Sequence, residues 1–349
     1  MALAPSFTSV DADGKRLRFV AEYRAVVMAT TCVGILAVDF ASIFPRSNAK
    51  TEEFGYSGMD LGTGCILCAT AVCSKQARGT VSGSRPAALA KRLFSLWPVL
   101  AIGLSRLALL RGIDYHVPTS EYGVHWNFFF TITVVALVST ALDLGPMASL
   151  IAGVATLSGY QLFLSSLGGA HFILHAPRVD LFSANREGAL SCAGFLSLHW
   201  LSVALGSLLR PGMRPAAQTT ALLLLAALVS AAATALMESM GLRVSRRMCN
   251  LPYVTFAISV NAWVLALLAF LDLWAGRPRA RMSLTLGGIQ DSMLAAFLAA
   301  NIFTGAVNVS LQPLLVPFWP ALAIMALYCL CWSVPFAVLN SCGRDLKFW

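Results

Sequence analysis

The stretch LPYVTFAISVNAWVLALLAFL (251–271) decides the fold class of this chain. It contains no charged residue and has the length that a membrane-spanning helix needs, roughly 20 residues. Its apolar residues follow one another without the alternation that is typical of strands in a transmembrane β-barrel. The stretch therefore predicts an α-helix that crosses a bilayer.

Similar apolar runs recur along the whole chain and are joined by short connections. We predict an all-α, polytopic transmembrane helix bundle that forms a single domain over residues 1–349, with a cytoplasmic N-terminal tail at 1–24. The sequence before the first run lacks the apolar core of a cleavable signal peptide. About ten spans are expected, at 25–44, 55–74, 93–110, 124–142, 147–166, 188–209, 218–238, 251–271, 289–311 and 315–338.

The composition supports this class and excludes others. Of 349 residues, 58% are hydrophobic and only 12% are charged, whereas soluble domains carry about 25% charged residues. The net charge of +9 does not indicate nucleic-acid binding, because the cations are scattered over short loops and form no basic stripe. Most of the nine Cys lie inside apolar runs, and the pair Cys65 and Cys68 has no second pair, so we expect no metal site.

The distribution of cations predicts the orientation. With the N-terminus placed in the cytoplasm, roughly two-thirds of the Lys and Arg residues fall on the cytoplasmic side, as the positive-inside rule requires. We therefore expect both termini to be cytoplasmic. The unusual polar loops, at 44–55, 114–127, 183–188 and 245–250, then all lie on the opposite side, where we expect the functional site.

Three arginines of this opposite side, Arg243, Arg246 and Arg247, run against the charge rule. Cations kept on that side can serve another purpose, and Arg is suited to bidentate contact with phosphate. We predict that Arg246 and Arg247 bind an anion.

Asp39 lies near the non-cytoplasmic end of the first predicted span. A carboxylate at this depth is costly and normally has a partner or a function. The nearest cations on that side are Arg46 and Lys50. One interpretation is a structural ion pair at a helix end. The other is a catalytic pair, in which Asp39 accepts a proton from a hydroxyl group and Lys50 stabilises a developing oxyanion.

Glu121 and His125 are four residues apart at the start of the fourth predicted span, so on a helix they would share one face. Glu121 could then orient the imidazole as a general base, with Asn127 as a further donor and Asp114 close by. The alternative is a belt of interfacial residues, for which the neighbouring Trp126 is typical.

The remaining polar residues within apolar runs give weaker signals. Asp60 begins the second predicted span, where it either satisfies its neighbours or supports the site. His171 and His175 have a spacing compatible with metal binding, but no third ligand completes the set. His199 stands alone in an apolar run and is expected to be a satisfied core residue.

The order of these motifs resembles the inositol acyltransferase family of glycosylphosphatidylinositol (GPI) anchor biosynthesis. The resemblance covers residues 35 to 349, and two of its motifs are long and specific. The matching stretches are ILAVDF (35–40), FPRSNAKTEEFG (44–55), SGMDLGTG (57–64), DYHVPTSEYGVHWNFFFT (114–131), SANREGALS (183–191), SRRMCNLPYV (245–254), ANIFTGAVN (300–308) and KFW (347–349).

The resemblance implies an enzyme of the endoplasmic reticulum membrane with its motif loops in the lumen. Such an enzyme transfers a fatty acyl chain, typically palmitoyl, from the co-substrate acyl-CoA to the inositol ring of glucosaminyl-phosphatidylinositol, without a permanently bound cofactor. Family members carry further spans before the VDF motif, so we expect this chain to be short at its N-terminus. The resemblance implies that Asp39 and Lys50 are the catalytic pair, and it gives headgroup or framework roles to Asn185, Arg186, Glu187, Arg246, Arg247 and Asn250.

Two other functions are compatible with a polytopic bundle. A lipid transporter or scramblase would also have many spans and buried charges. Such a protein would be expected to show paired repeats and interrupted midplane helices, and the sequence indicates neither. A membrane O-acyltransferase with a different acceptor is the second alternative.

Overall fold

The computed structural model describes residues 17–80, 85–110, 121–275 and 282–346. Within these ranges the regular secondary structure is helical, which confirms the predicted all-α class. The α-helices are α1 (Arg18–Ala37), α2 (Leu61–Ala71), α3 (Arg85–Ser95), α4 (Trp97–Leu110), α5 (Phe128–Leu142), α6 (Pro146–Ser166), α7 (Gly169–His175), α8 (Leu181–Ala184), α9 (Arg186–Gly206), α10 (Ala216–Ser239), α11 (Leu251–Trp274), α12 (Leu284–Asp291), α13 (Met293–Ser310) and α14 (Phe318–Ser341), with 3₁₀ turns η1 (Arg46–Asn48), η2 (Gly58–Asp60), η3 (Ser207–Leu209) and η4 (Pro313–Leu315).

Seven of the helices in the described part of the chain are long and apolar enough to cross a membrane: α1, α6, α9 with η3, α10, α11, α13 and α14. Helices α3 and α4 meet the same test only as a pair, bent by 43°. Each of the predicted spans contains a helix, but α5 has 15 residues and α2 has 11. These two helices are too short to cross a bilayer alone, since a span needs roughly 20 residues.

The first span begins earlier than predicted, because α1 starts at Arg18 and ends at Ala37. Arg18 is buried, and its guanidinium lies 2.6 Å from Asp272 and 3.4 Å from Glu22. The carboxylates neutralise its charge, so the helix continues through a position that hydropathy alone assigns to the tail. As a result, Asp39 lies beyond the helix, in the turn that follows it.

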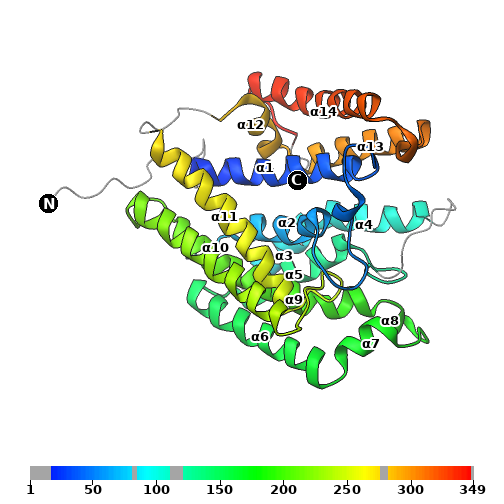
Figure 1. Ribbon diagram of the computed structural model, residues 1–349. Coiled ribbons are helices and arrows are strands. Elements are labelled where there is room, and N and C mark those ends of the chain that lie inside the picture. Colours follow the sequence, from blue (N-terminus) through cyan, green and yellow to red (C-terminus); the bar gives the residue numbers. More distant parts are fainter. Residues whose placement is uncertain (1–16, 81–84, 111–120, 276–281, 347–349) are drawn as a thin grey trace.

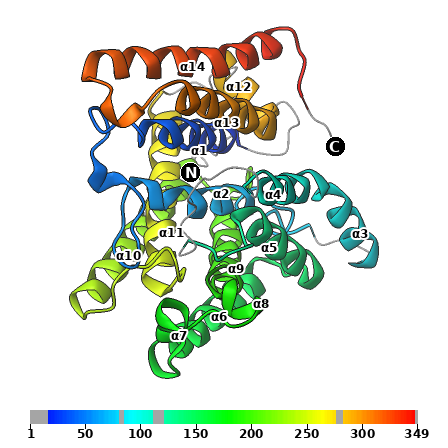
Figure 2. The same cartoon turned by 90° about the vertical axis from the view of Figure 1, so that its right-hand side faces the viewer.

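The helices pack in three groups (Figures 1 and 2). One group holds α1, α12, α13 and α14, in which α12 lies against both α1 and α14. The second is the pair α10 and α11, and the third surrounds α9, which contacts α2, α5 and α6. Helix α11 contacts α1, α2 and α9 as well as α10, so it connects the three groups.

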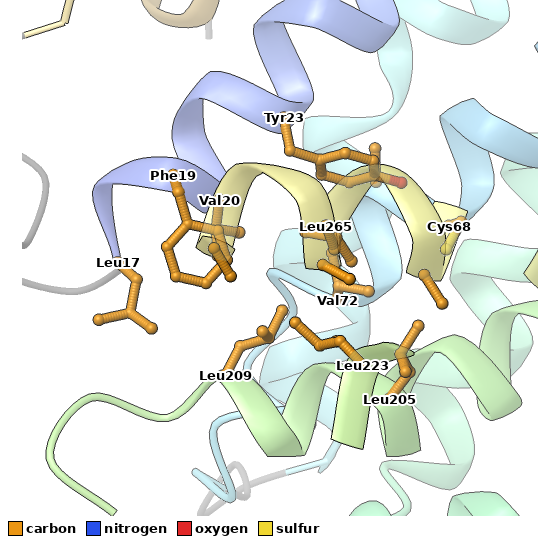
Figure 3. Close-up of a cluster of buried hydrophobic side chains, with 14 of the residues drawn as sticks. Leu17, Phe19, Val20, Tyr23, Cys68, Val72, Leu205, Leu209, Leu223 and Leu265 are labelled. Atoms are coloured by element: carbon orange, nitrogen blue, oxygen red, sulfur yellow. The ribbon is translucent and has the colours of Figure 1, made fainter. Parts of the chain in front are cut away.

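The largest buried apolar cluster lies where these groups meet (Figure 3). Tyr23 of α1, Leu205 of α9, Leu223 of α10 and Leu265 of α11 all point into it, together with Val72 at the end of α2. In a bilayer, lipid is as apolar as these side chains, so close packing stabilises the cluster more than exclusion of water does.

Gly194 allows α9 to lie close to the loop that precedes α11. A Cβ atom at Gly194 would overlap the carbonyl oxygen of Cys249 and lie 2.9 Å from its Cβ. The backbone of Cys249 adopts a positive φ of 48°, so this loop is tightly constrained. The close contact fixes the loop 244–250 against the centre of α9.

We predict that Gly194→Ala destabilises the protein by about 1–3 kcal/mol, because the added methyl group overpacks a backbone contact. The matched control is Gly159→Ala in α6, where an added Cβ meets nothing within 4 Å. That change should be neutral or stabilise the helix by up to about 1 kcal/mol. The midpoint of thermal unfolding in detergent should be measured for both variants. Equal midpoints would contradict the close contact between Gly194 and Cys249.

Candidate functional site

The described parts of the four polar loops singled out in the sequence meet at one end of the bundle. We call residues 38–60, 121–127, 176–185 and 240–250 the motif end. Backbone hydrogen bonds join these loops: Gly55 N donates to Val244 O at 2.8 Å, and Val124 N donates to Ala184 O at 2.9 Å. The prediction that the motifs lie on a common side of the bundle is therefore confirmed.

Asp60 is the buried centre of the motif end. Its side chain is fully buried, and Arg246 Nε donates to its Oδ1 at 2.7 Å. The backbone N–H and the hydroxyl of Ser57 both donate to Oδ2 at 3.0 Å, and the Thr51 hydroxyl does so at 3.0 Å. Because buried carboxylates need such partners, the structure favours the interpretation that Asp60 satisfies its neighbours.

Glu121 connects this buried pair to the surface. Its Oε1 lies 2.9 Å from Lys50 Nζ and 3.7 Å from Arg246 Nη2. Burial alone would raise the pKa of Glu121, but the positive charges of Lys50 and Arg246 outweigh it and lower that pKa. Asp60, Arg246, Glu121 and Lys50 thus form one alternating chain of charges. Its outer member, Lys50, has 47% of its side chain exposed and can reach a ligand.

The predicted helical pairing of Glu121 with His125 is wrong. Residues 121–127 are not helical, because Gly123 has a φ of 111° and α5 begins only at Phe128. Asn127 is the N-cap of α5, where its side chain accepts a hydrogen bond from Phe129 N at 3.0 Å. A capping residue has non-helical backbone angles, so Glu121 and His125 do not share a helical face.

Glu187 is the centre of a second buried charge cluster. Its Oε1 lies 2.6 Å from Arg178 Nη2, 2.9 Å from Arg247 Nη2 and 3.9 Å from Arg186 Nε. Arg186 also donates from Nε to the carbonyl of Ile173 at 2.9 Å. These contacts support the framework role for Arg186 and Glu187, and Arg247 is neutralised by the same carboxylate. Binding of phosphate by Arg246 and Arg247 stays a prediction.

Asn185 and Asn250 shape the loops rather than facing open space. Asn185 Oδ1 accepts from the backbone N–H groups of His125 at 2.7 Å and Trp126 at 2.9 Å. Asn250 Oδ1 accepts from Ser245 N at 3.0 Å and from Tyr253 N at 3.2 Å, so it caps α11. Each amide is therefore used to position a neighbouring loop.

Asp39 and Lys50 have different partners in this structure. Asp39 is half-buried and accepts a hydrogen bond from Asn308 Nδ2 of α13 at 2.9 Å. Lys50 is paired with Glu121, and none of the ion pairs among the described residues joins it to Asp39. The catalytic pairing stays a prediction. Asn308 was missed as a site residue, although it closes the quoted motif 300–308.

The other candidate positions are settled by simple contacts. His199 is buried, and its Nε2 lies 2.9 Å from the hydroxyl of Ser139, which confirms a satisfied core residue. The rings of His171 and His175 are 5.4 Å apart. Within the described ranges, no group of three potential metal-binding side chains occurs. Asp114 lies outside the described residues.

An apolar cavity of about 670 Å³ borders the motif end. It lies between α4, α5, α8 and the start of α9, with His125 and Trp126 in its wall. Sequence reasoning missed it, because the side chains that form it come from four separate segments. The lining residues are Leu100, Leu107, His125, Trp126, Phe130, Thr133, Val134, Leu181, Phe182, Asn185 and Ala189.

These features define a class: a multi-pass helical membrane protein in which a charged site adjoins an apolar cavity. The chain belongs to the GWT1 family, because the model of that family matches residues 4–339.

Curated relatives can be aligned with nearly the whole chain. An uncharacterized protein of Arabidopsis thaliana is 35% identical over 96% of this chain and 77% of its own length. The phosphatidylinositol-glycan biosynthesis class W protein of Dictyostelium discoideum is 31% identical over 99% of this chain and 78% of its own length. The glucosaminyl-phosphatidylinositol-acyltransferase PIGW of Bos taurus is 29% identical, also over 99% and 78%.

Proposed function

We propose that this chain is an acyltransferase of GPI-anchor biosynthesis. It transfers a fatty acyl chain, typically palmitoyl, from acyl-CoA to an inositol hydroxyl of glucosaminyl-phosphatidylinositol. The observation that carries the proposal is membership of the GWT1 family, together with relatives named as glucosaminyl-phosphatidylinositol acyltransferases. A helix bundle with charged side chains beside an apolar cavity suits substrates that have a polar headgroup and hydrocarbon chains.

The proposed chemistry uses Asp39 and Lys50. Asp39 removes the proton from the inositol hydroxyl as its oxygen attacks the thioester carbonyl. The ammonium group of Lys50 stabilises the negative charge on the tetrahedral intermediate. When that intermediate collapses, the C–S bond breaks, the CoA thiolate leaves and takes up a proton, and an ester remains on the inositol. Lys50 reaches this position by leaving Glu121, which its exposure at the protein surface permits.

The site residues divide into two sets by burial. Asp60 and Glu187 are fully buried and paired, so we assign them to holding the loops. Asp39 is only half-buried and Lys50 is exposed, as groups that meet a substrate must be.

An assay with radiolabelled palmitoyl-CoA and glucosaminyl-phosphatidylinositol tests the proposal, in microsomes from cells that lack their own inositol acyltransferase. Expression of this chain should restore label in the inositol lipid. A transporter or scramblase would leave the label in acyl-CoA. An O-acyltransferase with another acceptor would place it in a different lipid or in protein.

We further propose that the motif end faces the lumen of the endoplasmic reticulum and that both termini are cytoplasmic. Glu52 lies in a motif-end loop and Lys75 follows α2, and both side chains are exposed. In sealed microsomes, a membrane-impermeant maleimide should label Lys75→Cys but reach Glu52→Cys only after permeabilisation. The unsubstituted chain gives the background from native cysteines. Labelling of Glu52→Cys from outside intact vesicles would reverse the orientation.

A further inference from the structure

The cavity between α4, α5, α8 and α9 offers a surface for hydrocarbon. The polar groups in its wall are mostly occupied: Thr133 donates to Phe129 O at 2.9 Å, and Trp126 Nε1 donates to the Thr131 hydroxyl at 2.9 Å. The Asn185 oxygen accepts two backbone N–H groups. A ligand inside the cavity therefore meets leucine, phenylalanine and valine side chains. Its volume of about 670 Å³ falls in the range typical of small-molecule sites.

The cavity is accessible from the outer surface of the bundle. Leu181 and Phe182 of α8 line it and are themselves exposed over 73% and 54% of their surface. Nearby on α4, Leu104 is also exposed, by 59%. A lipid that diffuses in the bilayer can thus insert a chain between α4 and α8 without leaving its apolar surroundings.

Charged side chains lie on and around the loop 121–126, which supplies two residues of the cavity wall. The imidazole of His125 lies in the wall and has no hydrogen bond to any described residue, while its backbone is fixed by Asn185. The same loop carries Glu121, which binds Lys50 at 2.9 Å. Arg106, next to the lining residue Leu107, is exposed, and its charge also acts on Glu121. An anionic headgroup beside this loop would meet the exposed side chains of Arg106 and His125, whereas the charge of Lys50 is balanced by Glu121.

We propose that this cavity binds one hydrocarbon chain of the inositol phospholipid acceptor, with the lipid phosphate held near Arg106. The inference rests on the proposed function. The reacting hydroxyl of the acceptor is separated from its hydrocarbon chains by the inositol ring, the phosphate and the glycerol. The acyl donor differs, because its reacting carbonyl is the first atom of its chain, so its pocket must begin at Asp39.

The position of Asp39 agrees with this assignment. Asp39 contacts Asn308 of α13, and no residue of α13 lines the cavity. Because neither Asp39 nor Asn308 lines the cavity, the cavity suits the acceptor tail rather than the donor acyl chain, whose carbonyl must reach Asp39. The headgroup then extends from the cavity, past Lys50, toward Asp39.

Photo-crosslinking tests the occupant directly and requires no turnover. The probe is phosphatidylinositol with a diazirine at the end of one acyl chain, added to the full chain in phosphatidylcholine nanodiscs. We expect labelled peptides that contain Phe130–Val134 and Leu181–Ala189. Unlabelled phosphatidylinositol should compete, whereas palmitoyl-CoA should not. Equal labelling by a diazirine phosphatidylcholine, or labelling by diazirine palmitoyl-CoA at these same peptides, would overturn the assignment.

A second test fills the cavity. Ala189→Phe should raise the KM for glucosaminyl-phosphatidylinositol about tenfold or more, with the KM for palmitoyl-CoA unchanged. The KM for an acceptor that lacks the diacylglycerol should also stay constant, because that molecule has no chain to place. The control is Ala155→Phe on the exposed face of α6, which should change neither value. Val134→Phe repeats the test at another wall residue.

These outcomes separate the inference from the proposed function. A rise in the KM for palmitoyl-CoA would identify a donor pocket, and unchanged KM values for both substrates would show that the cavity is not used. Absence of acyl transfer to every acceptor by the unsubstituted chain would refute the proposed function, while the crosslinking result would still report whether the cavity holds an inositol lipid.

Discussion

Asp39→Asn should reduce acyl transfer about 10²–10⁴-fold, the usual contribution of a general base. The amide keeps the shape of the side chain but cannot accept the hydroxyl proton. Asp39 is half-buried, and its hydrogen bond within the described structure comes from Asn308. The carboxamide can still accept from Asn308, so the folded yield and the unfolding temperature should stay near those of the unsubstituted protein.

Lys50→Met tests the partner of Asp39. It keeps the aliphatic stem and removes the charge that we assign to the oxyanion. If the two residues act as a unit, the double variant should be no worse than the worse single variant. The matched control is Glu52→Gln, an exposed position on the same loop, which should keep full activity. Full specific activity in Asp39→Asn would contradict this mechanism and would make His125 the next candidate for the base.

Asp60→Asn should lower the stability of the protein, whereas the activity per folded molecule should stay near that of the unsubstituted chain. Asp60 is fully buried, and Arg246 lies 2.7 Å away with 4% of its side chain exposed. Removing the carboxylate leaves a buried guanidinium with a weaker counter-charge, since Glu121 is 3.7 Å away. Breaking a buried ion pair in this way costs about 3–5 kcal/mol.

Comparing the two Asp→Asn variants gives a sharp control, because the chemical change is the same at both positions. Thermal unfolding and activity per folded molecule should be measured on the same detergent-purified samples. Addition of Arg246→Gln to Asp60→Asn should recover part of the lost stability, because both buried charges are then absent. A normal unfolding temperature with lost activity in Asp60→Asn would instead move Asp60 into the catalytic machinery.

The helices of this protein were predictable from the sequence where apolar residues are continuous. The run 251–271 predicted α11 with ends that differ by only a few residues. The predicted helix boundaries were wrong where a polar residue lies inside a helix or caps its N-terminus. Arg18 lies inside α1 because Asp272, far away in the chain, neutralises it. The helix of the predicted span 124–142 begins late, at Phe128, because the side chain of Asn127 caps the N-terminus of α5.

The sequence predicted which loops form the site, but not which charged side chains in those loops pair with each other. Charge bias placed the motif loops on a common side, and the structure joins them there. The pairs Lys50 with Glu121 and Asp60 with Arg246 are long-range contacts, and no local spacing determines which carboxylate meets which cation. The cavity was equally hidden, because it depends on how side chains from four segments pack.

Inositol acylation by this chain can be measured on the purified protein. The most direct measurement uses the purified chain in nanodiscs with palmitoyl-CoA and glucosaminyl-phosphatidylinositol, followed by mass spectrometry of the lipid and quantification of free CoA. We expect one added palmitoyl group on the inositol ring, labile to alkali, and one CoA released for each lipid modified, with both signals lost in Asp39→Asn. An unmodified lipid in the presence of folded protein, or palmitate on another part of the molecule, would contradict the proposed function.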